Sequence, residues 1–244
     1  MIVYGRNPVR EALRGRRATG VSEIWATSAT AREPWLRLRS PHVVSGEEIE
    51  RLCGSGAHQG VCAQAGPYPY VSADVLLAVP GGLLVALDQV QDPQNLGSIC
   101  RTAECAGVNG VLIPGRRAAE VTPAVCKASA GAVEHLPVAR VRNVADVLRD
   151  ARAAGYWCYG ACAPGGEEDR VPVPYDRPDY SGAGVVLVLG SEGKGLRPRV
   201  AGECDELIML PQRGRIESLG VAAAAAALLY EILQSRSASL DNAT

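Results

Sequence analysis

The sequence predicts an α/β fold, in which a small α/β unit precedes a larger parallel sheet with helices on both faces. Residues 83–87 and 185–189 are apolar runs without alternation, as is typical of strands buried on both sides. Strand-like and helix-like segments alternate from residue 83 onward, an order that favours a parallel sheet. Proline and glycine cluster near residues 66–70 and 80–82, where we expect a linker. We therefore assign residues 1–66 to an N-terminal unit, 67–81 to the linker, 82–236 to a C-terminal unit and 237–244 to a flexible tail.

Two helix starts can be assigned in the N-terminal unit. Asn7 followed by Pro8 is typical of a helix cap and first turn. Ser45 with Glu48 three residues later matches a capping box and predicts a helix to about Cys53. We also expect a short helix at 34–38 and strands at 23–26, 42–45 and 60–65.

The C-terminal unit is longer and regular in its alternation. Strands are expected at residues 83–87, 110–113, 136–141, 156–161, 185–189 and 206–210. Helices are expected at 95–106, 123–130, 144–154, a short stretch from 196, and 217–234. A loop rich in proline and glycine should span about 163–182.

Composition excludes several classes of protein. The chain has 244 residues and a net charge of −1, so it is not basic throughout, although its first 65 residues carry nine arginines and six glutamates. The eight cysteines form no C-x-x-C pair and do not cluster with the histidines, which argues against structural zinc and for small buried side chains. No apolar run has the length of a membrane span or of a signal peptide's core, so we expect a cytoplasmic protein.

A glycine-rich loop, Gly190 to Leu196, follows the strand at 185–189. Glycines let a ligand approach the backbone, and ligand sites in open α/β sheets lie at the carboxyl ends of strands. The loop is not a Walker A motif, because Gly195 rather than Ser or Thr follows Lys194. Nor is it a dinucleotide fingerprint, since the third glycine is missing.

Two further motifs flank this loop along the chain. The first, residues 88–103, contains Asn95, placed to cap a helix, and Arg101 almost two turns further on. The second, residues 210–222, runs into an alanine-rich helix whose small side chains permit close packing. Taken singly, Asn95 is equally well explained as a helix cap, and Arg101 as a surface residue that forms an ion pair.

Together the three motifs resemble those of the SpoU (TrmH) family of RNA ribose 2′-O-methyltransferases. The family patterns are N-x-G-x-[IC]-x-R-[TS]-A, L-G-[SA]-E-G-x-G-L and P-x-x-G-x-x-x-S-L. The resemblance covers residues 83–235. Tyr4-Gly5 and His58-Gln59-Gly60-Val61 also look like the small substrate-binding domain of bacterial large-subunit rRNA guanosine 2′-O-methyltransferases.

The resemblance implies a deep trefoil knot formed by segments 184–196 and 206–220, with S-adenosylmethionine bound inside it, and a homodimer. It implies an active site that contains Asn95, Arg101, Glu192 and Ser218. The cofactor would be held by Leu189, Gly190, Gly193, Leu210, Ser218 and Leu219. No metal is needed, because the sulfonium charge already activates the methyl group. RNA contacts are expected from local arginines: Arg6, Arg10, Arg14, Arg17, Arg213 and Arg215.

The implied reaction is attack of a ribose 2′-hydroxyl on the sulfonium methyl, which needs alignment and a proton acceptor. Arginine is a poor base because it is essentially always protonated, so Arg101 is better suited to position the phosphate or hydroxyl. Glu192 could accept the proton or could anchor its own loop. Gly220 departs from the family pattern, which has asparagine at that position.

Four functional alternatives stay open at this point. The leading hypothesis is methylation of large-subunit ribosomal RNA. A tRNA ribose methyltransferase is disfavoured by the N-terminal unit, and an rRNA methyltransferase that confers antibiotic resistance shares all the motifs. Gly220 motivates the fourth alternative, a non-catalytic RNA-binding assembly factor.

Overall fold

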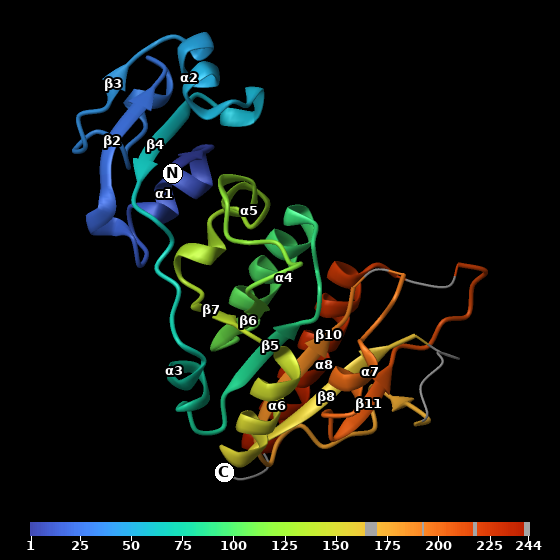
Figure 1. Cartoon of the computed structure of the whole chain (residues 1–244). Coiled ribbons are helices and arrows are strands. Elements are labelled where there is room, and N and C mark those ends of the chain that lie inside the picture. Colours follow the sequence, from blue (N-terminus) through green and yellow to red (C-terminus); the bar gives the residue numbers. More distant parts are fainter. Residues whose placement is uncertain (164–169, 192, 217–218, 242–244) are drawn as a thin grey trace.

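The computed structural model describes residues 1–163, 170–191, 193–216 and 219–241, which form two sheets at opposite ends of the molecule (Figure 1). The smaller sheet has four strands in the order β1-β4-β2-β3. The larger has seven in the order β7-β6-β5-β10-β8-β11-β9, and every neighbouring pair in it is parallel. This arrangement confirms the predicted fold class.

The N-terminal unit contains the smaller sheet. Its elements are β1 (Ile2–Tyr4), α1 (Arg6–Ala12), β2 (Val21–Ala26), β3 (His42–Val43), α2 (Gly46–Cys53) and β4 (Val61–Ala65). The capping box is confirmed, because the Ser45 side chain accepts a hydrogen bond from the Glu48 backbone N–H at 3.2 Å. The cap predicted at Asn7 is wrong: the N-cap is Gly5, so α1 begins two residues earlier than expected. Residues 34–38 form turns rather than the short helix that we expected.

The C-terminal unit shows the predicted alternation of strands and helices. Its strands are β5 (Leu83–Leu87), β6 (Gly110–Pro114), β7 (Val138–Val141), β8 (Tyr156–Cys162), β9 (Val173–Pro174), β10 (Gly184–Leu189) and β11 (Glu206–Met209). Its helices are α4 (Pro93–Cys105), α5 (Pro123–Ala128), α6 (Val144–Ala153), α7 (Pro198–Ala201) and α8 (Val221–Asp241). Strand β9 lies within the segment that we expected to be a loop, and α8 extends past its expected end at residue 234.

Both faces of the larger sheet are covered by apolar side chains. Alternate residues of β5 point to opposite faces, so Val85 and Leu84 belong to different buried clusters. Ile99 of α4 and Leu228 of α8 pack in the Val85 cluster, whereas Leu148 of α6 packs with Leu84. The described residues contain no helix that is both long and apolar enough to cross a membrane.

Helix α4 starts earlier than the sequence predicted. The Asp92 side chain accepts a hydrogen bond from the Gln94 backbone N–H at 3.0 Å, and Pro93 occupies the first helical position. Asn95 therefore lies inside the first turn and is not the cap. Asp-Pro is the stronger start signal of the two, because proline's missing N–H costs nothing at the first helical position.

Residues 67–81, expected to be a linker, pack against the C-terminal unit. The Tyr68 hydroxyl donates to the carbonyls of Val133 and Leu136 at 2.9 and 2.8 Å. A short helix, α3 (Ala73–Leu77), follows, and its Leu76 is buried on the α6 side of the sheet. The segment thus adds contacts to the larger sheet's core.

A buried ion pair joins the two units. Arg17 and Glu134 lie 117 positions apart in the sequence, and their Nε and Oε2 atoms are 2.9 Å apart. Arg17 is 4% exposed and Glu134 is fully buried. The Arg17 guanidinium also donates to the Gly66 carbonyl at 3.1 Å and lies over the Tyr68 ring. Arg17 is therefore a structural residue at the junction, and the expectation that it binds RNA is wrong.

We predict that Glu134→Ala lowers the free energy of unfolding by about 3–5 kcal/mol, because it leaves the Arg17 charge buried without its partner. Chemical denaturation of the purified protein measures this change. The control is Glu33→Ala, which removes a half-buried glutamate that pairs with the exposed Arg6 at 3.2 Å and should cost about 0–1 kcal/mol. Equal effects of the two substitutions would contradict the structural role of the buried pair.

Candidate functional site

The carboxyl ends of β5 and β10 meet at one edge of the larger sheet. The two strands pair in parallel, with Leu87 opposite Leu189, so the loops that follow them start side by side. Together with the start of α8, these loops border a cavity of about 330 Å³. Its lining includes Val90, Asp92, Asn95, Ser191, Lys194 and Val221.

The glycine-rich loop after β10 closes on itself. The backbone N–H of Ser191 donates to the Gly195 carbonyl at 3.1 Å, and that of Gly195 donates back at 3.0 Å. Gly190 lies under this bridge, and a Cβ there would be 2.2 Å from the Gly195 carbonyl carbon. Gly193 and Gly195 have φ values of 79° and 64°, in the left-handed region. The shape of the loop therefore requires all three glycines, one for close approach and two for backbone conformation.

A buried carboxylate that our sequence analysis missed holds this loop in place. Asp88 directly follows β5 and is fully buried. It accepts hydrogen bonds from the backbone N–H and from Nε of Arg197 at 2.9 and 2.8 Å, and its own N–H donates to the Leu189 carbonyl at 2.7 Å. The sequence signal that could have identified Asp88 is its position directly after the apolar run of residues 83–87, at the end of a strand buried on both faces. Asp88 thus joins the first motif to the end of the glycine-rich loop.

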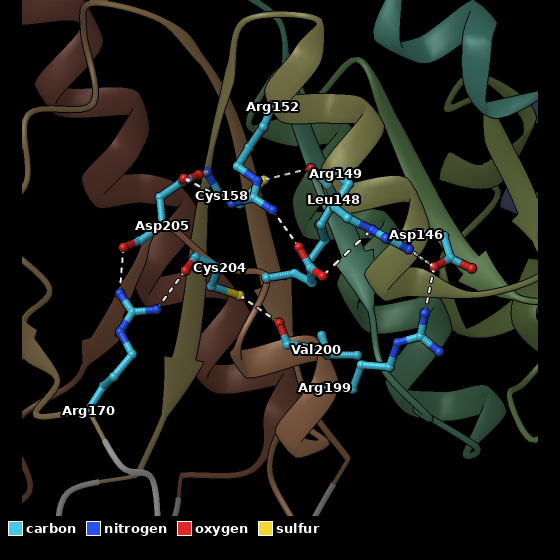
Figure 2. Close-up of polar contacts among 11 residues, drawn as sticks. Asp146, Leu148, Arg149, Arg152, Cys158, Arg170, Arg199, Val200, Cys204 and Asp205 are labelled. Atoms are coloured by element: carbon cyan, nitrogen blue, oxygen red, sulfur yellow. Dashed lines mark hydrogen bonds and ion pairs between the residues drawn. The ribbon is translucent and has the colours of Figure 1, made fainter.

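Helix α7, which follows the loop, is also held by ion pairs with α6. Figure 2 shows a network of charged side chains between α6, α7 and β11. Arg199 pairs with Asp146 at 2.8 Å, and Arg152 pairs with Glu203. The Asp205 carboxylate accepts a hydrogen bond from the backbone of β8 at 2.7 Å. The exit of the loop is therefore held by Asp88 through Arg197 and by α6 through Arg199.

The residues expected to bind the cofactor belong to segments next to this cavity, but those that the structure describes are not part of its lining. Leu189 is buried at the end of β10, and Gly190 and Gly193 belong to the closed loop. Leu210 follows β11 and packs on the main buried cluster, whereas Leu219 is exposed before α8. Glu192 and Ser218 lie outside the described residues.

Arg101 does not line the same cavity as Asn95. Six residues of α-helix advance about 240° around the axis and about 9 Å along it, so the two side chains leave α4 on different faces. Arg101 shares its face with Gly97, whose Cβ would be 2.4 Å from the Ala128 side chain. It lines a second cavity of about 320 Å³ between α1 and α4. A single chain therefore does not bring these two expected active-site residues together.

The arginines expected to bind RNA lie in two places. Arg6 and Arg10 are on α1, where Arg6 pairs with Glu33, and Arg10 pairs with Glu11 at 2.9 Å and lines the second cavity. Arg213 and Arg215 are exposed in the segment before α8. Arg14 is exposed in the turn after α1, beside Glu11.

The cysteines are mostly buried and unreactive. Burial raises the pKa of the Cys100, Cys126 and Cys204 thiols to about 12, so they stay protonated near neutral pH. Within the described part of the chain, no group of three or more His, Cys, Asp or Glu side chains could hold a metal ion.

Comparison with known proteins follows the same division of the chain. The model of the SpoU rRNA Methylase family matches residues 82–230. A second model, described as RNA 2′-O ribose methyltransferase substrate binding, matches residues 2–71. YacO of Bacillus subtilis, named as a TrmH family tRNA/rRNA methyltransferase, is 36% identical over 96% of this chain and 95% of its own length.

Two solved structures are similar over nearly the whole chain, and a third is similar over about two thirds of it. An AdoMet-bound rRNA methyltransferase from Sinorhizobium meliloti is 29% identical, with a TM-score of 0.76 over 96% of this chain and 86% of that one. The SpoU methyltransferase AviRb from Streptomyces viridochromogenes, in complex with the cofactor AdoMet, is 26% identical, with a TM-score of 0.79 over 98% and 91%. A TrmH/SpoU tRNA modifying enzyme from A. aeolicus, 25% identical with a TM-score of 0.56, covers 68% of this chain and 81% of its own.

We predict that Asp88→Ala lowers the free energy of unfolding by about 2–3 kcal/mol, because it removes charge-assisted hydrogen bonds from a buried site. It should also speed hydrogen exchange at the Arg197 amide, which donates to Asp88. Exchange followed by NMR or mass spectrometry over residues 193–200 tests this directly. Asp146→Ala, which removes an exposed partner of Arg199, should cost less than about 1 kcal/mol and leave that amide protected.

Proposed function

Because the chain belongs to the SpoU (TrmH) family of S-adenosylmethionine-dependent RNA methyltransferases, we propose that it methylates a ribose 2′-hydroxyl of ribosomal RNA. The observation that carries this proposal is the N-terminal unit, which matches a 2′-O ribose methyltransferase substrate-binding model. The rRNA methyltransferase neighbour matches both units of the chain, whereas the tRNA modifying enzyme covers only about two thirds of it. In this proposal, residues 1–66 dock the RNA and residues 82–236 carry out the transfer.

We place S-adenosylmethionine in the cavity at the ends of β5 and β10. The chemistry of the lining suits this cofactor. Val90 and Val221 offer apolar surface, Asn95 and Ser191 offer hydrogen-bonding groups, and Lys194 offers a cation for a carboxylate. Segments 184–196 and 206–220 form the proposed trefoil knot around it, and Leu189, Gly190, Gly193, Leu210, Ser218 and Leu219 are the proposed contacts.

The residues of the chain then have to align the ribose and accept one proton. The cofactor supplies a methyl group that its sulfonium charge has already activated, so no metal is needed for the step. Arg101 holds the phosphate beside the target ribose through its planar fork of N–H donors. Glu192 is the chemically suitable acceptor for the hydroxyl proton, with Asn95 and Ser218 as neighbouring polar groups. With the cofactor held by its proposed contacts, the hydroxyl oxygen would receive the methyl group that the cofactor supplies, and Glu192 would take the hydroxyl proton.

A homodimer would bring the separated parts of the site together. Ile216, Leu219 and Tyr230 are 79%, 54% and 51% exposed. Ala223 and Ala227 are exposed on the same face of α8 as Tyr230, because these positions repeat every three to four residues. We propose that this apolar stripe packs against a second copy of the chain, so that Arg101 of one copy serves the cofactor cavity of the other.

Gly220 favours one competing function. Its φ of 76° lies in the left-handed region, where asparagine is among the better tolerated residues other than glycine. The backbone therefore keeps a shape that asparagine could adopt, but the amide group is missing. A non-catalytic RNA-binding factor would bind cofactor and RNA without transferring methyl, and Gly220→Asn would then restore turnover.

The test of the proposed function is methyl transfer from labelled S-adenosylmethionine to unmodified large-subunit rRNA, with ribose methylation mapped along the product. We predict label at one 2′-hydroxyl. We predict a loss of about 100-fold or more in kcat/KM for Arg101→Ala, because alignment of the reacting groups carries much of the barrier reduction. The affinity of this variant for S-adenosylmethionine should not change.

Two variants serve as controls in the same assay. Gly190→Ala should lose cofactor binding, since its Cβ would collide with Gly195. Arg177→Ala removes an exposed arginine after β9 and should behave as the wild type. Label on tRNA alone would identify tRNA, and not rRNA, as the substrate. The absence of label on either RNA would overturn the proposal that the protein is a methyltransferase for these RNAs.

For the dimer, we predict that Tyr230→Glu places a charge in the apolar contact and converts the protein to a monomer in sedimentation analysis. Methyl transfer should fall with it. A wild-type chain that sediments as a monomer would contradict the shared site.

A further inference from the structure

We propose that the cavity between α1 and α4 is a subsite for one unpaired RNA nucleotide adjacent to the methylated one. This inference rests on the proposed function and concerns the second cavity of about 320 Å³, which no assigned role explains beyond Arg101. One wall comes from the N-terminal unit and the other from the catalytic unit. A nucleotide bound here would therefore fix the register of the RNA relative to the cofactor.

The walls of the cavity contain polar groups from both units. Asn7 and Arg10 come from α1, Arg101 and Glu104 from α4, and Ser129 from the turn after α5. The volume lies near the lower end of the range for small-molecule pockets, about 300–1,000 Å³, which suits one nucleotide and excludes a duplex. RNA recognition by sequence commonly uses unstacked nucleotides whose base edges meet such polar groups.

The cavity is a fixed feature of the fold. Gly131 has a φ of 90°, and a Cβ there would lie 2.8 Å from the Glu11 side chain and 3.2 Å from the Asn7 carbonyl oxygen. This contact brings α1 directly onto the turn that forms the cavity floor. The buried Arg17–Glu134 pair fixes the same junction from the other side. The two walls are therefore held at a set separation before any ligand binds.

Among the charged side chains that line this cavity, Arg101 is available to bind a phosphate. Burial alone would raise the pKa of Glu11, but hydrogen bonds from His135 and Arg10 outweigh it and lower the pKa, so this carboxylate stays ionised and engaged. Among the described residues, no carboxylate forms an ion pair with Arg101. A phosphate can therefore occupy its fork of donors, while Asn7 and Arg10 face the sugar and base across the cavity.

Cys105 gives a direct readout of occupancy, because it is an exposed cysteine on the α4 wall. The experiment alkylates the full-length protein with a maleimide and follows Cys105 by mass spectrometry, with and without unmodified large-subunit rRNA. At ten times the RNA Kd, about one site in eleven is empty, so alkylation of Cys105 should slow about tenfold. S-adenosylmethionine alone should not slow it.

Matched variants on α1 separate the subsite from general charge. Asn7→Ala and Arg10→Ala should each raise the KM for RNA about tenfold, as expected for loss of one specific nucleotide contact. They should leave cofactor affinity and the thermal unfolding midpoint unchanged. The control is Arg51→Ala, which removes an exposed arginine on α2 that does not line the cavity and is not among the expected RNA contacts.

Three results would overturn the subsite. They are an unchanged alkylation rate of Cys105 when RNA is bound, a Cys105 that does not react in the free protein, and equal effects of Arg10→Ala and Arg51→Ala. Failure of the proposed function is distinguishable from these. A wild type that binds RNA and protects Cys105 but transfers no methyl would retain the subsite and reject the enzyme.

Discussion

The parallel pairing of β5 with β10 is the constraint on which the site depends. Both strands are buried on both faces, so their register is fixed by apolar packing as well as by hydrogen bonds. That register places the first motif and the glycine-rich loop at one edge of the sheet. Asp88 then joins them through Arg197, 109 positions away in the sequence. Without this pairing, the motifs would have no common location.

A second constraint sets how the two units meet. Val9 of α1 and Leu13, directly after it, belong to the same buried cluster as Ile99 of α4, so the N-terminal unit shares a core with the larger sheet. The Arg17–Glu134 pair adds an interaction that is costly to break because both charges are removed from water. The substrate-binding unit is therefore held in one orientation, and its helix α1 becomes part of the surface around Arg101.

Much of the larger sheet could be predicted from the sequence, because strands buried on both faces produce continuous apolar runs that few other structures explain. The helix starts were harder. Asn7 and Asn95 are good capping residues, but Gly5 and Asp92 hold those positions, and local sequence does not rank such competitors reliably. The sequence also could not reveal that Arg17 is buried, since its partner lies 117 positions away.

The candidate site was predictable in its residue types more than in its geometry. The motifs identify Asn95 and Arg101 as chemically relevant, yet helical periodicity places them in different cavities of one chain.

The strand order of the larger sheet has a consequence for synthesis. β10 lies between β5 and β8, and it emerges from the ribosome after both of them. Until it does, β5 has an unpaired edge, so the nascent chain exposes a strand that favours aggregation and needs protection during translation.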